Sequence, residues 1–469
     1  MAEAPAPPDP PGPLPAALEL VPAGPVRLRL AAPASKSVTN RALLCAALAA
    51  GTSHLAGAAA SDDAEAMAAA LAELGAGVDV GRVGGRAGPG PGGSGAAPPR
   101  PWTVAGTGGR LASPDRPLDA RLSGTTMRFL AAAATLTPAG ATVTGRPPLL
   151  RRPVGPLVAA LRALGAEIAD AGGGRPPVTA AGGGLEGGRA RVDAAASSQF
   201  ASAVLLVAPY ARRPVTLTAE RLGAAAYVDL TAAVMQIFGA GVEPAAAPTG
   251  PGLAAWRVEP GPYRAADLTV EYDASAAAHL FALAAATGGR VTVTNAAPGT
   301  LQPDAALPGL LATMGATVTR DGDALTVSGP EALAPVDADL AAMPDQVTTV
   351  AAVAALAHGR SRLRGVGVAR GHETDRLAAL AAELAKLGVA VTERPDGLEV
   401  AGKGPEALRP ARLATWGDHR MAMALAAVAA RVPGVVLEDP ACVAKTYPGF
   451  WRDLAAAGLV WRPHPGPVQ

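Results

Sequence analysis

The chain has 469 residues, of which 49% are hydrophobic and only 3% are aromatic, and its formal net charge is +1. This length exceeds what one ordinary hydrophobic core needs, so we expect two or more domains. The near-zero charge argues against a global field for nucleic acid or membranes, and the two cysteines, Cys45 and Cys442, supply neither a disulfide framework nor a metal-site spacing.

The N-terminal residues are rich in proline and alanine, and we interpret residues 1–25 as a disordered tail. No basic region followed by an apolar stretch is present there, so the segment does not resemble a secretory signal peptide. No apolar run in the chain reaches the length of a membrane span. The two thiols fit small core residues in a reducing cytosol, so a cytoplasmic protein is expected.

One short pattern recurs six times along the chain. Two apolar residues at helical spacing are followed by a glycine and then by alternating apolar and polar residues, as in "LAELGAGVDV" and "LAKLGVAVTE". This pattern is typical of the last turn of an amphipathic helix, a glycine cap and a strand. The six glycines are Gly75, Gly165, Gly239, Gly315, Gly388 and Gly458.

The spacing of these glycines predicts six copies of one α/β unit. Successive glycines are 70 to 76 residues apart, except that the first gap is 90 residues. The longer gap contains residues 81–99, a glycine- and proline-rich segment that we interpret as a loose insertion. Six units and two domains give three units per domain, each with a helix pair and several strands.

The segment "PASKSVTNRALL", residues 33–44, is typical of a helix N-terminus capped by Ser35 or Ser37. Lys36 is one of only four lysines, against thirty-six arginines, and Arg41 adds a second cation. Free backbone N–H groups at a helix start favour anions. Two interpretations stay open: an anion site, or a solvated helix start with surface charges.

Three further helix starts in the first half carry hydroxyls, an amide or arginines. They lie in "SGTTMRFL", "RRPVGPL" and "SSQF", and their polar and glycine residues include Gly124, Arg128, Arg151, Arg152, Ser197, Ser198 and Gln199. Hydroxyls and guanidinium groups together with helix N–H groups suit a phosphate. Plain helix capping is the alternative for each segment.

The second half adds carboxylates to cations at helix starts. Its motifs carry Asp345, His372, Glu373, Arg376, Asp418, His419, Arg420 and Lys445. Asp345 and Glu373 are candidate general acid/base groups tuned by these cations, although Asp345 also suits the helix dipole and Glu373 an i,i+3 pair. The chain has no P-loop, Rossmann fingerprint, zinc cluster or Ser-His-Asp signature. These observations favour a cofactor-free reaction on phosphorylated or carboxylated small molecules.

Eight motifs occur in the order found in one family, the 5-enolpyruvylshikimate-3-phosphate synthases, and resemble it over about residues 26–462. They are "SKSVTNRALL", "SGTTMRFL", "RRPVGPL", "SSQF", "MPDQ", "HETDRL", "GDHRMAMA" and "KTYPGFW". The resemblance implies the α/β (α+β) enolpyruvyl transferase fold, with two domains of three βαβαββ units, each an inside-out α/β barrel. One lobe would comprise residues 36–271 and the other residues 26–35 plus 272–469, with the active site in the cleft between them.

The resemblance also implies an activity in the shikimate pathway, which leads to chorismate and the aromatic amino acids. The enolpyruvyl group of phosphoenolpyruvate would pass to the 5-hydroxyl of shikimate-3-phosphate, with release of phosphate. No cofactor or metal is implied, and we expect a monomer without nucleic-acid or membrane partners.

The resemblance assigns roles to individual residues. Asp345 would accept the hydroxyl proton, and Glu373 or Lys36 would protonate the methylene carbon. The implied shikimate-3-phosphate site comprises Lys36, Ser37, Arg41, Ser197, Ser198, Tyr227, Asp345 and His372. The implied phosphoenolpyruvate site comprises Lys36, Gly124, Arg152, Gln199, Arg376, Arg420 and Lys445.

Four positions depart from the family pattern. Ala224 stands where the family usually has a serine that contacts the shikimate phosphate. Leu122 and Val368 stand where many or some members have asparagine, and His372 stands where some have lysine. These departures bear on substrate affinity and on the identity of the acceptor.

Two alternatives therefore stay open. One is a paralogous enolpyruvyl transferase with a different acceptor, of which UDP-N-acetylglucosamine enolpyruvyl transferase is the nearest example. That enzyme usually relies on a loop cysteine, which neither Cys45 nor Cys442 resembles. The other is an inactive binding paralogue, against which the retained Lys36, Asp345, Glu373 and Lys445 argue.

Overall fold

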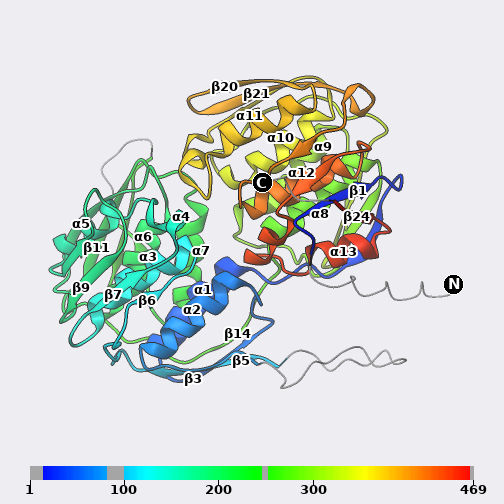
Figure 1. Cartoon of the computed structure of the whole chain (residues 1–469). Coiled ribbons are helices and arrows are strands. Elements are labelled where there is room, and N and C mark those ends of the chain that lie inside the picture. Colours follow the sequence, from blue (N-terminus) through cyan, green and yellow to red (C-terminus); the bar gives the residue numbers. More distant parts are fainter. Residues whose placement is uncertain (1–13, 82–99, 246–251, 465–469) are drawn as a thin grey trace. The chain divides into compact units, whose positions relative to one another are not determined.

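The computed structural model describes residues 14–81, 100–245 and 252–464, and within it the chain forms two compact units (Figure 1). The continuous unit is Ala34–Glu271, and the split unit combines Met1–Pro33 with Tyr272–Gln469. The sequence interpretation assigned Ala34 and Ser35 to the other lobe. They belong to the continuous unit, where Ser35 caps its first helix by accepting a hydrogen bond from the Val38 N–H at 3.4 Å.

The strands of the described residues form six four-stranded sheets that share one pattern of parallel and antiparallel neighbours. In one of them the order is β6-β7-β9-β8, where β6 is Leu118–Asp119, β7 Ala141–Thr144, β8 Glu167–Asp170 and β9 Val178–Gly182. β6 is parallel to β7, and β9 is antiparallel to both β7 and β8. Helix α3 (Gly124–Ala133) connects the parallel pair, and α5 (Gly155–Ala163) leads into β8. This is the predicted βαβαββ unit.

The continuous unit contains two more such sheets. Their orders are β14 (Asp267–Thr269), β3 (Ala50–Ala56), β5 (Trp102–Thr107), β4 (Gly77–Asp79), and β10 (Gly188–Asp193), β11 (Val215–Glu220), β13 (Ala254–Val258), β12 (Val242–Pro244). Their helices are α1 (Lys36–Leu48), α2 (Asp62–Glu73), α6 (Gln199–Val207) and α7 (Ala226–Ile237), and a short α4 (Pro147–Leu150) precedes α5.

The split unit contains the other three sheets. Their orders are β16 (Thr317–Asp321), β17 (Ala324–Ser328), β15 (Arg290–Val293), β2 (Arg27–Leu30); β18 (Asp337–Asp339), β19 (His358–Arg364), β21 (Gly397–Lys403), β20 (Ala390–Arg394); and β22 (Arg412–Leu413), β23 (Val436–Glu438), β1 (Ala17–Val21), β24 (Val460–His464). The helices are α8 (Ala274–Thr287), α9 (Leu307–Thr313), α10 (Val347–Ala355), α11 (Arg376–Lys386), α12 (His419–Ala429) and α13 (Phe450–Ala456).

The expectation of a disordered tail over residues 1–25 is wrong for its second half. β1 pairs antiparallel with both β23 and β24 and thereby completes the last sheet of the chain. Its sequence "ALELV" places Leu18 and Leu20 on the buried face, and both are fully buried. Burial of this alternating face against the sheet's own helices accounts for the order. Residues 1–13 lie outside the described residues.

The predicted helix–glycine–strand repeat is confirmed. Each of the six glycines has φ between +85° and +106°, the left-handed region that glycine enters without a steric penalty. Each directly follows the last turn of α2, α5, α7, α9, α11 or α13 and precedes β4, β8, β12, β16, β20 or β24. The predicted insertion at residues 81–99 lies outside the described residues except for Gly81.

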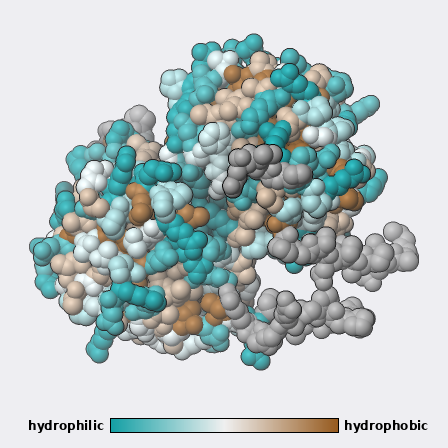
Figure 2. Space-filling view, viewed as in Figure 1, coloured by the Kyte–Doolittle hydropathy of each residue, from teal (hydrophilic) through white to brown (hydrophobic). Residues whose placement is uncertain are grey.

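Helices form the interior of each unit, and the sheets lie outside them. In the split unit α8, α10 and α12 pack against one another, and every residue of α10 and α12 is buried. In the continuous unit α1, α3 and α6 occupy the corresponding positions. The outer face seen in Figure 2 is largely polar, with small scattered apolar patches. Among the residues that the structure describes, no helix has the length and apolar character needed to span a bilayer.

Candidate active site

Arg376, the first residue of α11, is the centre of a polar cluster in the split unit. Its side chain is only 1% exposed. Nε and Nη2 donate to the two oxygens of Asp418 at 2.8 and 3.3 Å. Nη1 donates to Asp345 at 2.7 Å, and Nη2 also donates to Glu373 at 3.0 Å. Although burial opposes the charge, these three carboxylates raise the pKa of Arg376, so the guanidinium stays ionised.

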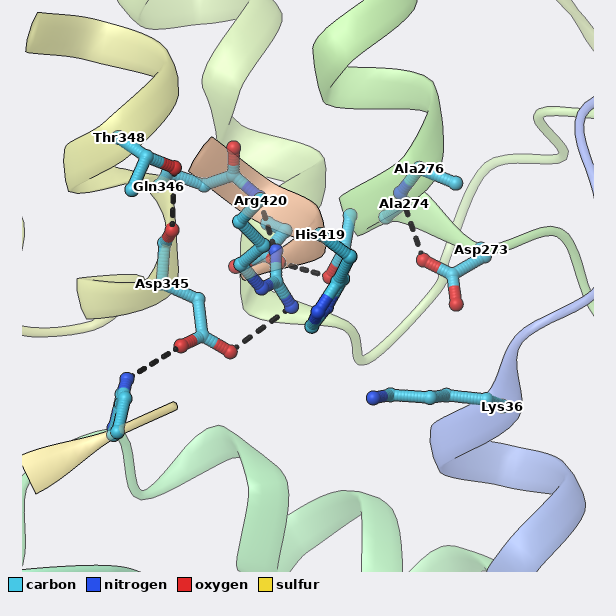
Figure 3. Close-up of polar contacts among 12 residues, drawn as sticks. Lys36, Asp273, Ala274, Ala276, Asp345, Gln346, Thr348, His419 and Arg420 are labelled. Atoms are coloured by element: carbon cyan, nitrogen blue, oxygen red, sulfur yellow. Dashed lines mark hydrogen bonds and ion pairs between the residues drawn. The ribbon is translucent and has the colours of Figure 1, made fainter. Parts of the chain in front are cut away.

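Asp345 is a carboxylate held by cations but still open to solvent. It lies in the 3₁₀ turn η4 (Pro344–Gln346), and 26% of its side chain is exposed. Its Oδ2 lies 3.0 Å from Arg420 Nη2, toward which it points in Figure 3, and its Oδ1 lies 3.1 Å from His372 Nδ1. Burial alone would raise the pKa of Asp345, but Arg420, His372 and Arg376 hold it well below its usual value. The group is therefore fully ionised at neutral pH.

Glu373 bridges two cations. Its Oε2 accepts from Arg376, the i,i+3 pair that the sequence allows, and its Oε1 accepts from Lys445 Nζ at 2.5 Å. Lys445 is buried at the end of the 3₁₀ segment η7 (Pro440–Lys445). Glu373 thus joins the start of α11 to the end of η7 through two ion pairs.

The start of α12 supplies the remaining members of this cluster. Asp418 is fully buried and caps the helix by accepting from the Arg420 N–H at 2.9 Å. The Arg420 side chain lies 3.9 Å from Asp304, a buried carboxylate that also accepts from Gln346 Nε2 at 2.9 Å. Burial raises the pKa of Asp304. We call Asp345, Glu373, Arg376, Asp418, Arg420 and Lys445 the carboxylate cluster.

A partly buried histidine, His372, and a buried one, His279, lie beside the carboxylate cluster. His372 Nδ1 is 2.9 Å from Arg376 Nη1, and burial lowers the pKa of His372 although Asp345 opposes the shift. His279, on α8, has its Nδ1 3.1 Å from Thr349 Oγ1, and Nε2 has no hydrogen-bond partner among the described residues. Burial, then Arg420 and Arg376, hold the pKa of His279 well below its usual value. Both rings are therefore largely neutral near pH 7.

In the continuous unit, Lys36 meets a carboxylate that the sequence did not reveal. Its Nζ lies 2.8 Å from Oδ2 of Asp63, which is buried at the start of α2. Ser61 caps that helix by accepting a hydrogen bond from the Ala64 N–H at 3.4 Å. The Lys36 ammonium thus has a fixed counter-charge next to the first turn of α1.

Arg41 is buried in α1 and donates to neutral groups. Nε donates to Thr231 Oγ1 at 2.7 Å, while Nη1 and Nη2 donate to the backbone carbonyls of Ser37 and Tyr227 at 2.8 and 3.1 Å. The guanidinium carbon lies 5.4 Å from the centre of the Phe129 ring. Burial lowers the pKa of Arg41 to about 10, so the group still carries its charge at neutral pH.

Arg128 joins the start of α3 to the start of α6. Its Nη1 donates to Gln199 Oε1 at 2.6 Å and to Ser197 Oγ at 3.2 Å. Gln199 in turn donates to Thr125 Oγ1 at 3.1 Å, and the guanidinium carbon lies 4.9 Å from the centre of the Phe200 ring. The sequence marked Arg128 as a cation at a helix start but gave it no role. Its contacts show that it orients Ser197 and Gln199.

Gly124 makes room for Arg152. A Cβ atom added at Gly124 would lie 2.5 Å from Arg152 Nη1, closer than real contacts allow. Glycine at the first residue of α3 therefore lets a guanidinium approach the helix start. Helix N–H groups and a guanidinium in one place suit an anionic ligand.

Comparison with known proteins identifies the family of this chain. The family model for EPSP synthase (3-phosphoshikimate 1-carboxyvinyltransferase) matches residues 21–454. The chain belongs to the EPSP synthase family. It is 39% identical to a 3-phosphoshikimate 1-carboxyvinyltransferase of Methanoculleus marisnigri, over 93% of this chain and 98% of that protein.

Solved structures agree with this family assignment. The EPSP synthase from Acinetobacter baumannii superposes with a TM-score of 0.75 at 25% identity, covering 95% of this chain and 99% of its own. The enolpyruvyl transferase NikO from Streptomyces tendae superposes with a TM-score of 0.72, covering 96% and 99% of the two chains. At 19% identity, the likeness to NikO shows the shared fold alone.

Most candidate residues of this EPSP synthase family member lie at or near helix starts, as the sequence predicts. In the split unit Asp345, His372, Glu373, Arg376, Arg420 and Lys445 are joined by direct contacts. In the continuous unit the contacts form three smaller groups, around Lys36, around Arg41 and around Arg128, with Arg152 beside Gly124. Tyr227 takes part through its backbone carbonyl, and Ser198 directly precedes α6.

Sequence reasoning missed Asp63, Asp304 and Gln346. Each is a buried polar residue whose partner lies 27 or more residues away. The acidic start "SDDAEAM" marks Asp63 as a helix-start acid, which is a common and uninformative pattern. Only the tertiary structure shows that its partner is Lys36.

Proposed function

We propose that this EPSP synthase family member transfers the enolpyruvyl group of phosphoenolpyruvate to the 5-hydroxyl of shikimate-3-phosphate and releases phosphate. The observation that carries this proposal is the carboxylate cluster, in which two partly exposed carboxylates are held by three cations. The reaction needs a proton acceptor and a proton donor next to bound anions, and this cluster provides that combination. The protein acts in the shikimate pathway, as a cytoplasmic monomer without a cofactor.

Phosphoenolpyruvate carries a carboxylate and a phosphate, which match arginine forks in geometry and charge. We assign its binding to Lys36, Gly124, Arg152, Gln199, Arg376, Arg420 and Lys445. Arg420 and Arg376 donate to Asp345. A substrate carboxylate that binds these arginines competes with that internal pairing.

Shikimate-3-phosphate carries a phosphate dianion and hydroxyl groups. We assign its binding to Lys36, Ser37, Arg41, Ser197, Ser198, Tyr227, Asp345 and His372. Arg41 contributes a full charge whose hydrogen bonds go to neutral oxygens, so its field is available to the ligand.

The competition for arginines explains how Asp345 becomes a base. Its pKa is held well below the usual value while Arg420, His372 and Arg376 face it. Anionic substrate shares those cations and adds negative charge nearby, and both effects raise the carboxylate pKa. Asp345 then accepts the 5-hydroxyl proton as that oxygen bonds to C2 of phosphoenolpyruvate.

Glu373 or Lys36 completes the addition by protonating the methylene carbon C3. The product of this step is a tetrahedral adduct whose phosphate and carboxylate are stabilised by the surrounding cations. Loss of phosphate from C2 and of a proton from C3 restores the double bond and yields the enolpyruvyl ether. The proton donor is regenerated in that second step.

The alternative with a catalytic cysteine finds no support in the thiols of this chain. Cys45 is fully buried in α1, and burial raises its pKa to about 12. Burial also raises the pKa of the Cys442 thiol to about 12. Neutral thiols of this kind are poor nucleophiles and poor acids at pH 7.

A phosphate-release assay tests the proposal. The purified protein should release phosphate when both phosphoenolpyruvate and shikimate-3-phosphate are present, and not when either is omitted. Substituting UDP-N-acetylglucosamine for shikimate-3-phosphate should abolish release. Absence of phosphate with both proposed substrates would overturn the function, and release with the nucleotide sugar would establish the paralogous transferase instead.

A further inference from the structure

The structure assigns Glu383 the role of a positioning residue that holds the loop between β22 and α12. Glu383 lies on α11, and its side chain is only 1% exposed. Its Oε2 accepts from the Ala414 N–H at 2.9 Å, and its Oε1 accepts from the Trp416 indole Nε1 at 3.0 Å. Lys386 Nζ donates to Oε2 at 2.6 Å. A buried carboxylate is costly unless such donors satisfy it.

The loop itself is held in a conformation that its sequence disfavours. Trp416 has φ of +58° and Gly417 has φ of +64°, both in the left-handed region. That region suits Gly417 but is rarely adopted by a bulky residue such as Trp416. Trp416 is also 53% exposed, so burial alone does not explain the conformation. The hydrogen bond from its indole to Glu383 holds the side chain in place.

Helix α11 contacts this loop at two points. Arg376 and Glu383 are seven residues apart, which is about two helical turns, so they share one face of α11. Arg376 binds both oxygens of Asp418 at the end of the loop, and Glu383 binds Ala414 and Trp416 at its beginning. A shift of the loop at one end would therefore strain the hydrogen bonds at the other end.

These contacts matter for the reaction because the loop ends in the carboxylate cluster. Asp418 orients the Arg376 guanidinium and caps the helix whose second residue is Arg420. These two arginines are assigned to phosphoenolpyruvate, so this inference rests on the proposed function. Loosening the loop should weaken phosphoenolpyruvate binding much more than shikimate-3-phosphate binding.

Glu383→Gln is the sharpest test because it keeps the size of the side chain. A glutamine has one acceptor oxygen, so its NH₂ group must face either Ala414 N–H or the Trp416 indole N–H. We expect KM for phosphoenolpyruvate to rise roughly tenfold, since small displacements of binding groups have effects of this order or larger. KM for shikimate-3-phosphate should stay within about twofold. Equal changes in both constants, or no change in either, would overturn the proposal.

Lys386→Met is the matched control. It removes another donor to the same carboxylate, but Lys386 is 44% exposed and holds no part of the loop. Its KM for phosphoenolpyruvate should match the wild type. Trp416→Phe removes one loop contact and keeps the other, so its effect should lie between those of the two other variants. If Glu383→Gln does not fold, the other two variants test the proposal. KM for phosphoenolpyruvate should then be higher in Trp416→Phe than in Lys386→Met, and equal KM values would contradict the role of Glu383.

A measurement without substrates separates this inference from the proposed function. Amide hydrogen exchange of residues 414–418 should be faster in Glu383→Gln than in the wild type and unchanged in Lys386→Met. If the wild-type protein shows no transferase activity but the exchange result holds, the proposed function is wrong and the role of Glu383 in holding the loop is supported. Unchanged exchange in Glu383→Gln would overturn the role of Glu383 in holding the loop, even in an active enzyme.

Discussion

The two units of this protein use the same βαβαββ architecture to build different electrostatic environments. In the split unit, Arg376 and Lys445 donate to carboxylates, and the carboxylate cluster contains three cations and three anions. In the continuous unit, Arg41 and Arg128 donate to hydroxyl, amide and carbonyl oxygens. One fold therefore surrounds buried cations with carboxylates in one unit and, at Arg41, with neutral oxygens in the other.

This difference teaches how the two units divide the work. A network of alternating charges tunes proton affinity, because each cation lowers and each anion raises the pKa of its neighbour. A cation whose hydrogen-bond partners are neutral is not compensated by them, so its positive field can act on a ligand. Burial of such a cation costs free energy. We therefore expect loss of Asp345 in the split unit to affect the chemical step, and loss of a hydroxyl beside Arg128 in the continuous unit to affect binding.

The largest expected effect is on turnover. Asp345→Asn should lower kcat by about 10²- to 10⁴-fold, the range usual for loss of a general base. The matched change in the continuous unit is Ser197→Ala, which should raise KM for shikimate-3-phosphate and leave kcat within about tenfold of wild type. Steady-state phosphate release with both substrates varied measures both constants. If the two variants had the same pattern, the division of work would be wrong.

The next effect concerns stability. Arg376→Met leaves Asp418 buried and without its arginine, so the free energy of unfolding should fall by about 3–5 kcal/mol. Arg41→Met leaves only neutral groups behind, and the loss should be about 1 kcal/mol or less. Urea unfolding of the two variants gives the comparison.

A second substitution provides the control for the stability prediction. Adding Asp418→Asn to Arg376→Met removes the stranded charge and should recover part of the lost free energy. Equal losses for Arg376→Met and Arg41→Met would show that the partners of the two arginines are energetically equivalent, against the contrast drawn here.

A smaller effect is the response to mild acid. His279 and His372 lie in the split unit and have folded-state pKa values below the usual 6.5. The unfolded chain therefore binds more protons below pH 6.5, so stability is fully present above that pH and falls as the pH drops. For His279 the loss between pH 6.5 and 5.5 should be about 1 kcal/mol.

The two units should differ in this response because the one histidine of the continuous unit, His54, is exposed. Hydrogen exchange at pH 7 and 5.5 should show protection falling in the split unit more than in the continuous unit. His279→Phe removes the titrating ring and should therefore flatten the pH dependence. Thr349 is not left without a partner, because it keeps its bond to Gln346. A pH dependence that survives this substitution unchanged would assign it to other groups.

The smallest expected effect is that of removing residues 82–99. Gly81 and Arg100 adjoin, since a Cβ on Gly81 would lie 2.6 Å from the Arg100 carbonyl oxygen, and β4 and β5 are antiparallel neighbours. In the split unit only two residues separate β16 from β17 and β20 from β21. Replacing residues 82–99 with Asn-Gly should change the free energy of unfolding by less than about 1 kcal/mol. A larger loss in a thermal melt would show that the segment stabilises the continuous unit.

Features set by neighbouring residues could be predicted from the sequence. The glycine caps, the helix starts and the sixfold repeat depend on local backbone preferences and hydrophobic spacing, and the structure bears them out. The Glu373–Arg376 pair is of the same kind, because three residues on a helix lie on one face.

Features set by distant residues could not be predicted. The partner of Lys36 is Asp63, and the partners of Glu383 are Ala414 and Trp416, which only the folded chain brings together. Strand β1 was missed for the same reason. Five alternating residues between prolines are too few to indicate a strand when the pairing strands follow several hundred residues later.

That strand has a consequence for the order in which the protein is made. β1 is synthesised before the other described strands, but its partners β23 and β24 are synthesised last among them, so the third sheet of the split unit cannot close until β24 has left the ribosome. All residues of the continuous unit emerge earlier and can fold while translation continues. In the finished protein Ala17 pairs with His464, so the two ends of the described chain lie side by side. A circular permutant that joins them would turn the latest-forming contact of the natural chain into a local hairpin.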